Sequence, residues 1–184
     1  MKTTEGWFIV DKISTRKSHR TRLAIPEKET IISGLNRPWS MAFITEEDVL
    51  VSEKEGDLVR VNISKKTKTK IKGYPNDIVD SIFGFGDNTG KFEVLVDPAF
   101  QQNKYVYLSY AAKGDGGKTT KVVRAKLDND ALTDIKTLLV ASPYTDNRHH
   151  YGGGMVFGSD GKLYITIGER LFTEQDEPAI PIAQ

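Results

Sequence analysis

The chain has 184 residues, of which 38% are hydrophobic and 28% are charged, a composition that excludes a disordered or membrane-spanning protein. Its formal net charge of +1 produces no overall field that would attract nucleic acid or an anionic membrane. The absence of cysteine excludes disulfides and thiolate metal sites.

The first part of the chain differs in amino-acid composition from the rest. Residues 1–29 are polar and rich in basic side chains, and we interpret them as a solvated lead-in rather than a nucleic-acid-binding arm. Their first seven residues hold no apolar run long enough for a signal peptide. Residues 30–184 form the expected folded domain.

From residue 31 onward, short apolar or alternating segments are separated by polar turns, which predicts β-strands. The predicted strands cover residues 41–43, 49–52, 57–61, 92–96, 104–110, 119–127, 132–140, 155–157 and 163–167. No amphipathic segment is long enough for a substantial helix. The sequence therefore predicts an all-β fold.

An internal repeat indicates the architecture. Val51-Ser52, Leu108-Ser109 and Ile165-Thr166 hold equivalent places in three copies of the strand pattern, and each copy is offset from the next by 57 residues. A period of this length, with several short strands in each copy, is typical of β-propeller blades. Because a closed ring needs about four to eight blades, the chain forms a partial β-propeller of about three blades. An arc of this kind exposes a blade edge, which favours self-association.

A lysine stripe occupies one face of a short segment. Lys66, Lys68, Lys70 and Lys72 alternate with other residues at period two. Such a stripe could bind phosphate, but lysines also protect the outermost strand of a sheet from pairing with other chains. We favour the edge-strand interpretation.

The third copy contains the strongest candidate for chemistry. It forms a hairpin around Asp160-Gly161, preceded by His149 and His150 and by the glycines at 152–154. The glycines would leave room for a ligand, and an imidazole can accept a proton near neutral pH. Neighbouring side chains alternate in a strand, so we expect His149 and His150 on opposite faces and no two-histidine metal site. From these residues alone, a histidine satisfied in a turn is as good a reading as a catalytic one.

Three groups of motifs resemble the soluble sugar dehydrogenases that use pyrroloquinoline quinone, the glucose/sorbosone dehydrogenase family of six-bladed propellers. The first is Pro38-Trp39 with Ser52-Glu53, and the second is Asp97-Pro98 followed by the strand at 104–110. The third is His150-Tyr151-Gly152-Gly153, followed by the hairpin and by Gly168-Glu169-Arg170. Together these motifs extend over roughly residues 30–184, the N-terminal half of such an enzyme.

The resemblance implies an oxidoreductase that converts an aldose-type hydroxyl to a lactone. In such enzymes a histidine removes the hydroxyl proton, hydride passes to pyrroloquinoline quinone, and Ca2+ polarises the quinone. By motif, the catalytic histidine is His150, and cofactor contacts fall on Asn88 and Gln184. The family's Ca2+ ligands and most of its cationic contacts to the quinone lie beyond this chain, so we expect no metal ligand here. Family members are usually exported, which implies a periplasmic or extracellular setting.

Two substitutions depart from the family pattern. Asn88 stands where the family has a longer glutamine, and Gly154 stands where it has an arginine. These departures favour a rival interpretation, a non-catalytic propeller module that binds a carbohydrate or a protein and in which His150 is structural.

Overall fold

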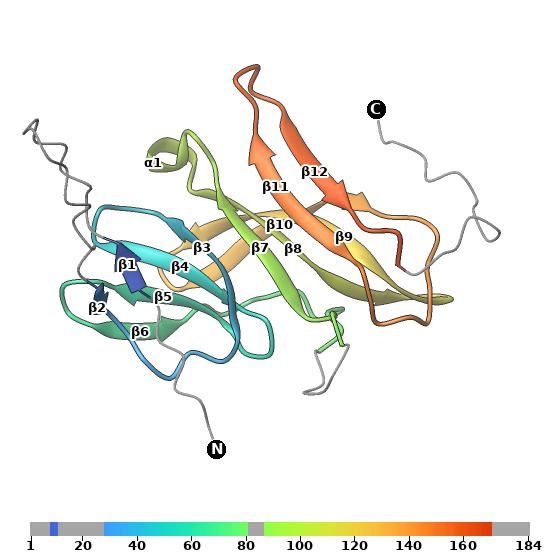
Figure 1. Ribbon diagram of the computed structural model, residues 1–184. Coiled ribbons are helices and arrows are strands. Elements are labelled where there is room, and N and C mark those ends of the chain that lie inside the picture. The colour runs from blue at the N-terminus through green and yellow to red at the C-terminus, as the bar shows by residue number, and fades with distance from the viewer. Residues whose placement is uncertain (1–7, 11–27, 81–86, 171–184) are drawn as a thin grey trace, which may run out of the picture.

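The computed structural model describes residues 8–10, 28–80 and 87–170, and these residues are almost entirely in antiparallel β-strands (Figure 1). Two of the sheets have four strands each, and their strand order follows the chain order. The first contains β3 (Pro38–Phe43), β4 (Asp48–Glu53), β5 (Leu58–Asn62) and β6 (Thr67–Lys70). The second contains β7 (Lys91–Val96), β8 (Tyr105–Gly114), β9 (Gly117–Asp128) and β10 (Ala131–Val140).

The third sheet has two described strands, β11 (Gly152–Phe157) and β12 (Leu163–Ile167). The first strands of the three sheets are neighbours, with β7 in contact with both β3 and β11. The repeated positions 51, 108 and 165 fall in β4, β8 and β12, the second strand of each sheet. The predicted partial propeller is therefore confirmed, with β3, β7 and β11 as the inner strands of three successive blades.

The main core lies between the first two sheets. Alternation along β4 points Leu50 toward the second sheet, where it joins Leu58, Val94, Val106 and Leu108. The intervening residues Val49 and Val51 face the other side and pack beneath residues 31–35. Burial on both faces explains why the middle of β4, residues 49–51, is apolar.

Serine hydroxyls connect the inner strands, which do not pair with one another as a sheet. Ser40 of β3 accepts a hydrogen bond from the backbone N–H of Val94 at 3.0 Å. Ser109 of β8 donates to the carbonyl of Gly153 at 2.5 Å and accepts from the N–H of Glu93 at 3.0 Å. These bonds satisfy backbone groups that would otherwise be buried without partners.

The lysine stripe lies on an outer strand, as predicted. β6 pairs only with β5 among the described strands. Lys66 forms an ion pair with Glu29 at 2.8 Å, and Lys70 forms one with Asp57 at 2.8 Å. Carboxylates of the chain itself thus pair with these two lysines, which favours the edge-strand interpretation over a phosphate site.

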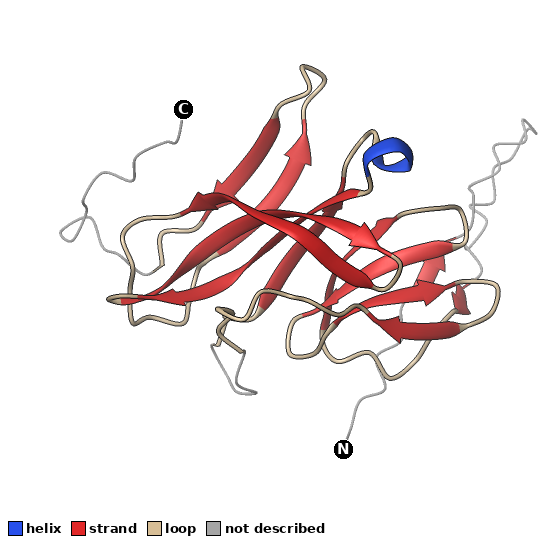
Figure 2. Cartoon of the chain, turned by 180° about the vertical axis from the view of Figure 1, so that it is seen from behind, coloured by secondary structure: helices blue, strands red, loops and turns tan. Residues whose placement is uncertain are grey.

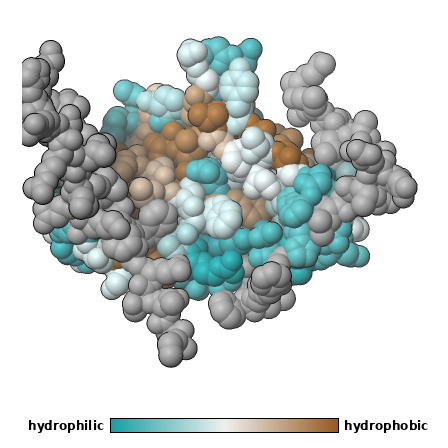
Figure 3. Space-filling view, viewed as in Figure 1, coloured by the Kyte–Doolittle hydropathy of each residue, from teal (hydrophilic) through white to brown (hydrophobic). Residues whose placement is uncertain are grey.

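Apolar side chains remain exposed at both ends of the arc. On β3 they are Trp39, Met41 and Phe43, and on the third sheet they are Val156 and Tyr164. Figure 3 shows apolar surface concentrated across the upper part of the molecule, with hydrophilic surface below it. In a complete ring these faces would meet neighbouring blades.

Three short elements were not predicted. They are β1 (Phe8–Val10), β2 (Lys28–Thr30) and α1 (Phe100–Asn103), of which β1 pairs with β2. α1 is a single helical turn between the predicted strands at 92–96 and 104–110 (Figure 2). In the described part of the chain, no helix has the length and apolar character needed to cross a membrane.

Candidate active site at the start of the inner strands

The sequence-predicted residues Asn88 and His150 lie at the same end of the sheets. Asn88 is three residues before β7, and His150 is two residues before β11. Since β4 and β12 run antiparallel to β3 and β11, the residues that follow them, Lys54 and Glu169, emerge at this end too. We call this end the inner-strand start.

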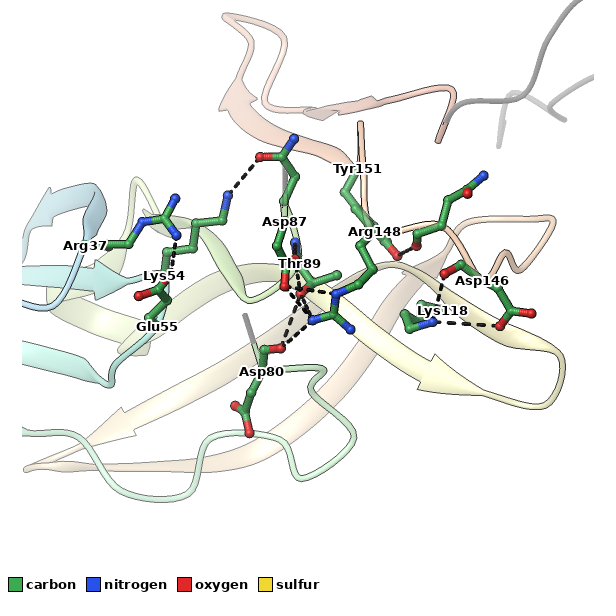
Figure 4. A network of polar contacts seen from close by, with 12 residues as sticks. Arg37, Lys54, Glu55, Asp80, Asp87, Thr89, Lys118, Asp146, Arg148 and Tyr151 are labelled. Atoms are coloured by element: carbon green, nitrogen blue, oxygen red, sulfur yellow. Dashed lines mark hydrogen bonds and ion pairs between the residues drawn. The ribbon is translucent and has the colours of Figure 1, made fainter. Parts of the chain in front are cut away.

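A bidentate ion pair joins the loops that carry Asn88 and His150. Nε of Arg148 donates to Oδ2 of Asp87 at 2.9 Å, and its Nη2 donates to the same oxygen at 2.7 Å (Figure 4). Arg148 also donates to the hydroxyl of Thr89 and to the carbonyl of Asp80, each at 2.9 Å. The backbone N–H of Asn88 donates to the carbonyl of Arg148 at 2.7 Å. The two loops therefore move as one unit.

His150 makes a side-chain contact with Glu169. Its Nδ1 lies within hydrogen-bond reach of Oε1 of Glu169, and both side chains are about half exposed. An ionised carboxylate only accepts hydrogen bonds, so Nδ1 is the donor, and in the neutral imidazole this tautomer leaves the lone pair on Nε2. This arrangement prepares Nε2 to accept a proton.

The expectation that His149 and His150 lie on opposite faces is wrong. Their ring centroids are 6.2 Å apart, with the rings edge to face. The pair lies in the loop before β11, and His150 has a positive φ of 52°. Strand alternation therefore does not apply to it. Among the described residues, no group of three or more His, Cys, Asp or Glu side chains could hold a metal ion.

The glycines at 152–154 are used for close packing within the protein. A Cβ on Gly152 would meet the backbone N of Gly168 at 2.6 Å, and one on Gly153 would meet the Phe92 ring at 2.8 Å. The space that we expected a ligand to use is thus occupied by neighbouring strands. A Cβ on Gly154 would lie 3.0 Å from the Thr166 hydroxyl.

Tyr151 anchors the histidine loop. It is buried, its hydroxyl donates to the carbonyl of Asn147 at 2.6 Å, and its ring packs 5.9 Å from that of Phe92. Burial raises the pKa of Tyr151 to about 12, although the nearby Arg148 and Arg170 act to lower it. The phenol therefore remains protonated and keeps donating at physiological pH.

Asn88 has a side-chain partner that the sequence did not suggest. Nζ of Lys54 lies 3.3 Å from Oδ1 of Asn88 and 4.3 Å from the centroid of the Trp39 ring. Lys54 is buried, and this burial lowers its pKa; Arg37 lowers it further, while Asp87 and Glu55 act to raise it.

The sequence did not single out two residues of the site, Glu169 and Lys54. The hairpin pairs Phe157 with Leu163, and counting outward from that pair brings Glu169 opposite residues 150–151, so strand register could have identified Glu169. Lys54 carried no such signal, because it reaches Asn88 between two separate sheets. The third predicted contact, Gln184, lies outside the described residues.

The tyrosines of β8 have mainly structural contacts. Tyr107 packs edge to face against Phe157 of the third sheet at 5.2 Å, and Tyr110 packs against Tyr74 at 5.6 Å. Tyr105 instead stacks on the guanidinium of Arg124, 3.9 Å away within its own sheet. Tyr107 therefore contacts the third sheet, whereas the contact of Tyr105 with Arg124 lies within the second sheet.

Consecutive antiparallel sheets whose first strands lie side by side define a partial β-propeller. Residues 35–179 match the family described as Glucose / Sorbosone dehydrogenase. The chain belongs to this family.

The chain is similar to several known proteins. It is 28% identical over 169 residues to Aldose sugar dehydrogenase YliI of Escherichia coli, a match that covers 90% of this chain and 44% of that protein. It is 28% identical over 195 residues to mouse Hedgehog-interacting protein, covering 94% of this chain and 26% of that protein. The structure of the PQQ-bound form of Aldose Sugar Dehydrogenase from Streptomyces coelicolor has a TM-score of 0.68 at 22% identity, covering 93% of this chain and 45% of that one. The chain spans less than half the length of these relatives.

Proposed function

We propose that the chain contributes the first blades of a sugar dehydrogenase that oxidises an aldose-type hydroxyl, with His150 as the general base. The observation that carries this proposal is the contact between Nδ1 of His150 and the Glu169 carboxylate. Family membership and the similarity to an aldose sugar dehydrogenase support the same reaction.

Each residue of the site has a distinct role in this proposal. Glu169 holds the imidazole in the tautomer that keeps the lone pair on Nε2, and Nε2 takes the hydroxyl proton. Asn88 orients the hydroxyl through its side-chain amide. Asp87 and Arg148 act as positioning residues, because their ion pair fixes the two loops that carry Asn88 and His150.

Pyrroloquinoline quinone is the proposed cofactor, and it would accept the hydride. The described residues suit the sugar side of this reaction better than the cofactor side. Arg37 pairs with Glu55 and Arg148 pairs with Asp87, so both guanidinium groups are already engaged with carboxylates of the chain, and the ammonium of Lys54 is buried against Asn88 and Trp39. Within the described ranges no carboxylate cluster suits Ca2+. The partners of the quinone carboxylates and of Ca2+ are therefore assigned to residues outside the described part of the chain.

The test is steady-state kinetics of the full-length protein supplied with pyrroloquinoline quinone and Ca2+, measured as dye reduction with aldoses. His150→Ala should lower kcat about 10²-fold to 10⁴-fold, the usual contribution of a general base. His149→Ala is the matched control, since its ring is a neighbour but lacks the Glu169 contact, and it should change kcat less than threefold, within about 0.7 kcal/mol. Full activity in His150→Ala would disprove the role of His150.

The second candidate is a non-catalytic module that binds a carbohydrate or a protein through the loops of the inner-strand start. The Asn88 and Gly154 departures favour it, as does the similarity to Hedgehog-interacting protein. If the parent protein reduces no dye with any aldose while it remains folded, this function replaces the first.

Two further proposals concern the setting of the protein. Among the described strands β12 pairs only with β11, and we propose that its other edge supports self-association. The proposed compartment is periplasmic or extracellular, in keeping with sugar oxidation outside the cytoplasm, and fractionation of cells that express the full-length protein tests it.

A further inference from the structure

Lys54 is a buried cation without an ion pair. Its side chain is 1% exposed, and its ammonium contacts Oδ1 of Asn88 and the face of the Trp39 ring. None of the ion pairs formed within residues 28–80 and 87–170 includes it.

Stability does not account for this lysine. Burying an ammonium away from water is unfavourable unless a carboxylate or several hydrogen bonds replace its hydration. The contact with Trp39 offsets part of that penalty. The lowered pKa of Lys54 has the same origin, since burial disfavours its charged form. A methionine of similar length would fill the same space without that penalty, so the charge needs another explanation.

The charge determines which way the Asn88 amide faces. An ammonium only donates hydrogen bonds, so Asn88 must turn Oδ1 toward Lys54 and Nδ2 away from it. The Asn88 backbone is also fixed, because its N–H donates to the Arg148 carbonyl. Asn88 is therefore held at both its backbone and its side chain, and it offers the two N–H groups of its amide to a ligand.

We propose that Lys54 is a positioning residue that fixes the Asn88 amide as a donor to the sugar oxygen from which His150 takes the proton. This inference rests on the proposed dehydrogenase function. The oxygen gains negative charge as its proton leaves for Nε2 of His150, and an N–H donor stabilises that charge. An Asn88 amide turned the other way would present Oδ1 and would repel it.

The contact with Lys54 explains how Asn88 can replace the longer glutamine of the family. Asparagine is one methylene shorter than glutamine and reaches less far from its strand. Lys54 lies on the neighbouring sheet and contacts the carbonyl end of this short side chain, as the dashed line from Lys54 in Figure 4 shows. The lysine thus supplies an anchor suited to the shorter amide.

The test combines side-chain amide signals of Asn88 with kinetics, in the full-length protein labelled with 15N-asparagine. In Lys54→Met the Asn88 amide signals should shift and broaden, and addition of D-glucose should no longer move them as it does in the parent. The kcat should fall about tenfold to a hundredfold with KM changed less than threefold, because a misplaced donor is lost mainly from the transition state. The urea midpoint should stay the same or rise.

Three further variants separate positioning from structure. Lys54→Arg, which still donates to Oδ1, should restore at least part of the lost kcat. Asn88→Asp keeps a partner for Lys54 but offers an acceptor in place of the donor, so the protein should remain folded while kcat falls as in Lys54→Met. Lys70→Met removes an exposed lysine paired with Asp57 and should change neither signal nor rate.

The amide signals test the role of Lys54, and the activity tests the proposed function, so either hypothesis can be rejected without the other. Unchanged Asn88 signals in Lys54→Met would overturn the inference even in an active enzyme, and so would a lowered urea midpoint with an unchanged kcat. If the parent protein reduces no dye with any aldose, the proposed function fails, whereas the signals still report whether Lys54 orients Asn88.

Discussion

The first two sheets and the third sheet differ in what holds them in place. Between the two four-stranded sheets lies a continuous core in which Leu50, Val106 and Tyr110 are fully buried. On the two-stranded third sheet, Val156 is 59% exposed and Tyr164 is 54% exposed. Hydrophobic burial thus stabilises the first pair of sheets far more than it stabilises the third.

The third sheet depends instead on a few specific contacts at its inner strand. Thr120 donates to the carbonyl of Tyr151 at 2.6 Å, and Ser109 donates to that of Gly153. The Tyr151 ring packs on Phe92 of the second sheet. These contacts lie beside His150, whereas Lys54 follows β4 and Asn88 precedes β7, strands of the two sheets that enclose the large core. The two halves of the candidate site therefore rest on supports of different strength.

The largest effect expected from this comparison is that of Leu50→Ala. Leu50 is fully buried between two complete sheets, so the substitution leaves a cavity that the strands cannot close. We expect a loss of about 4 kcal/mol in the free energy of unfolding. Urea unfolding followed by circular dichroism measures it. Val156→Ala removes a branched side chain from the third sheet and should cost less than about 0.5 kcal/mol; equal losses in the two variants would contradict the comparison.

The repeat explains why the fold could be predicted and where the prediction stopped. Alternating apolar residues and turn signals recur at a fixed period, so the ten strands from β3 to β12 follow from local sequence. The turn around Asn129, for example, carries the positive φ that an Asp-Asn-Asp turn favours. β1, β2 and α1 carry no such period: β1 and β2 form by pairing with each other across about twenty residues of chain, and α1 is a single turn held by local backbone hydrogen bonds.

The candidate site was predictable only where it depends on one hairpin. His150 was identified from its motif, and Glu169 follows from the register of β11 and β12. The pairing of Lys54 with Asn88 and that of Asp87 with Arg148 join residues 34 and 61 positions apart. Such contacts arise from the angle between sheets, which no local pattern encodes. The packing role of Gly152 and Gly153 was missed for the same reason.

Gly153→Ala should have an intermediate effect, because Gly153 packs directly against Phe92 and Ser109 of the second sheet. Its φ is +94°, and an added Cβ would meet Phe92 at 2.8 Å and the Ser109 hydroxyl at 3.1 Å. We expect a loss of about 2–3 kcal/mol from backbone strain and overpacking together. Protection of the amides of β11 against hydrogen exchange should fall before that of β8 does.

Gly161→Ala is the matched control for that substitution. Gly161 also has a positive φ, +75°, but no atom lies within 4 Å of an added Cβ. The free energy of unfolding of Gly161→Ala should therefore fall only by the cost of placing alanine at a positive φ, about 1 kcal/mol. If Gly161→Ala is as costly as Gly153→Ala, the close approach of β11 to Phe92 contributes nothing, and the third sheet is held by other contacts.

The smallest effect on stability, and a specific effect on association, is expected at the edge of β12. The outer strand β6 carries lysines, which discourage pairing with another chain. β12 carries no lysine and has Tyr164 and Thr166 among its residues. Tyr164→Lys should leave the free energy of unfolding within about 0.5 kcal/mol, since the side chain is more than half exposed. It should weaken self-association by about tenfold, because a charged side chain on an edge strand opposes strand pairing. Sedimentation velocity over a range of concentrations measures this.

Ser159→Lys adds the same charge in the exposed turn between β11 and β12, away from the strand edge, and should associate like the parent. This control separates strand pairing from a general effect of charge. If both variants associate as the parent does, the edge of β12 is not the contact surface, and the apolar face of β3 with Met41 and Phe43 becomes the next surface to test. If Tyr164→Lys alone dissociates, the third sheet differs from the first in its edge as well as in its core. In that case the lysines of β6 protect one end of the arc, and β12 forms the end that accepts a partner strand.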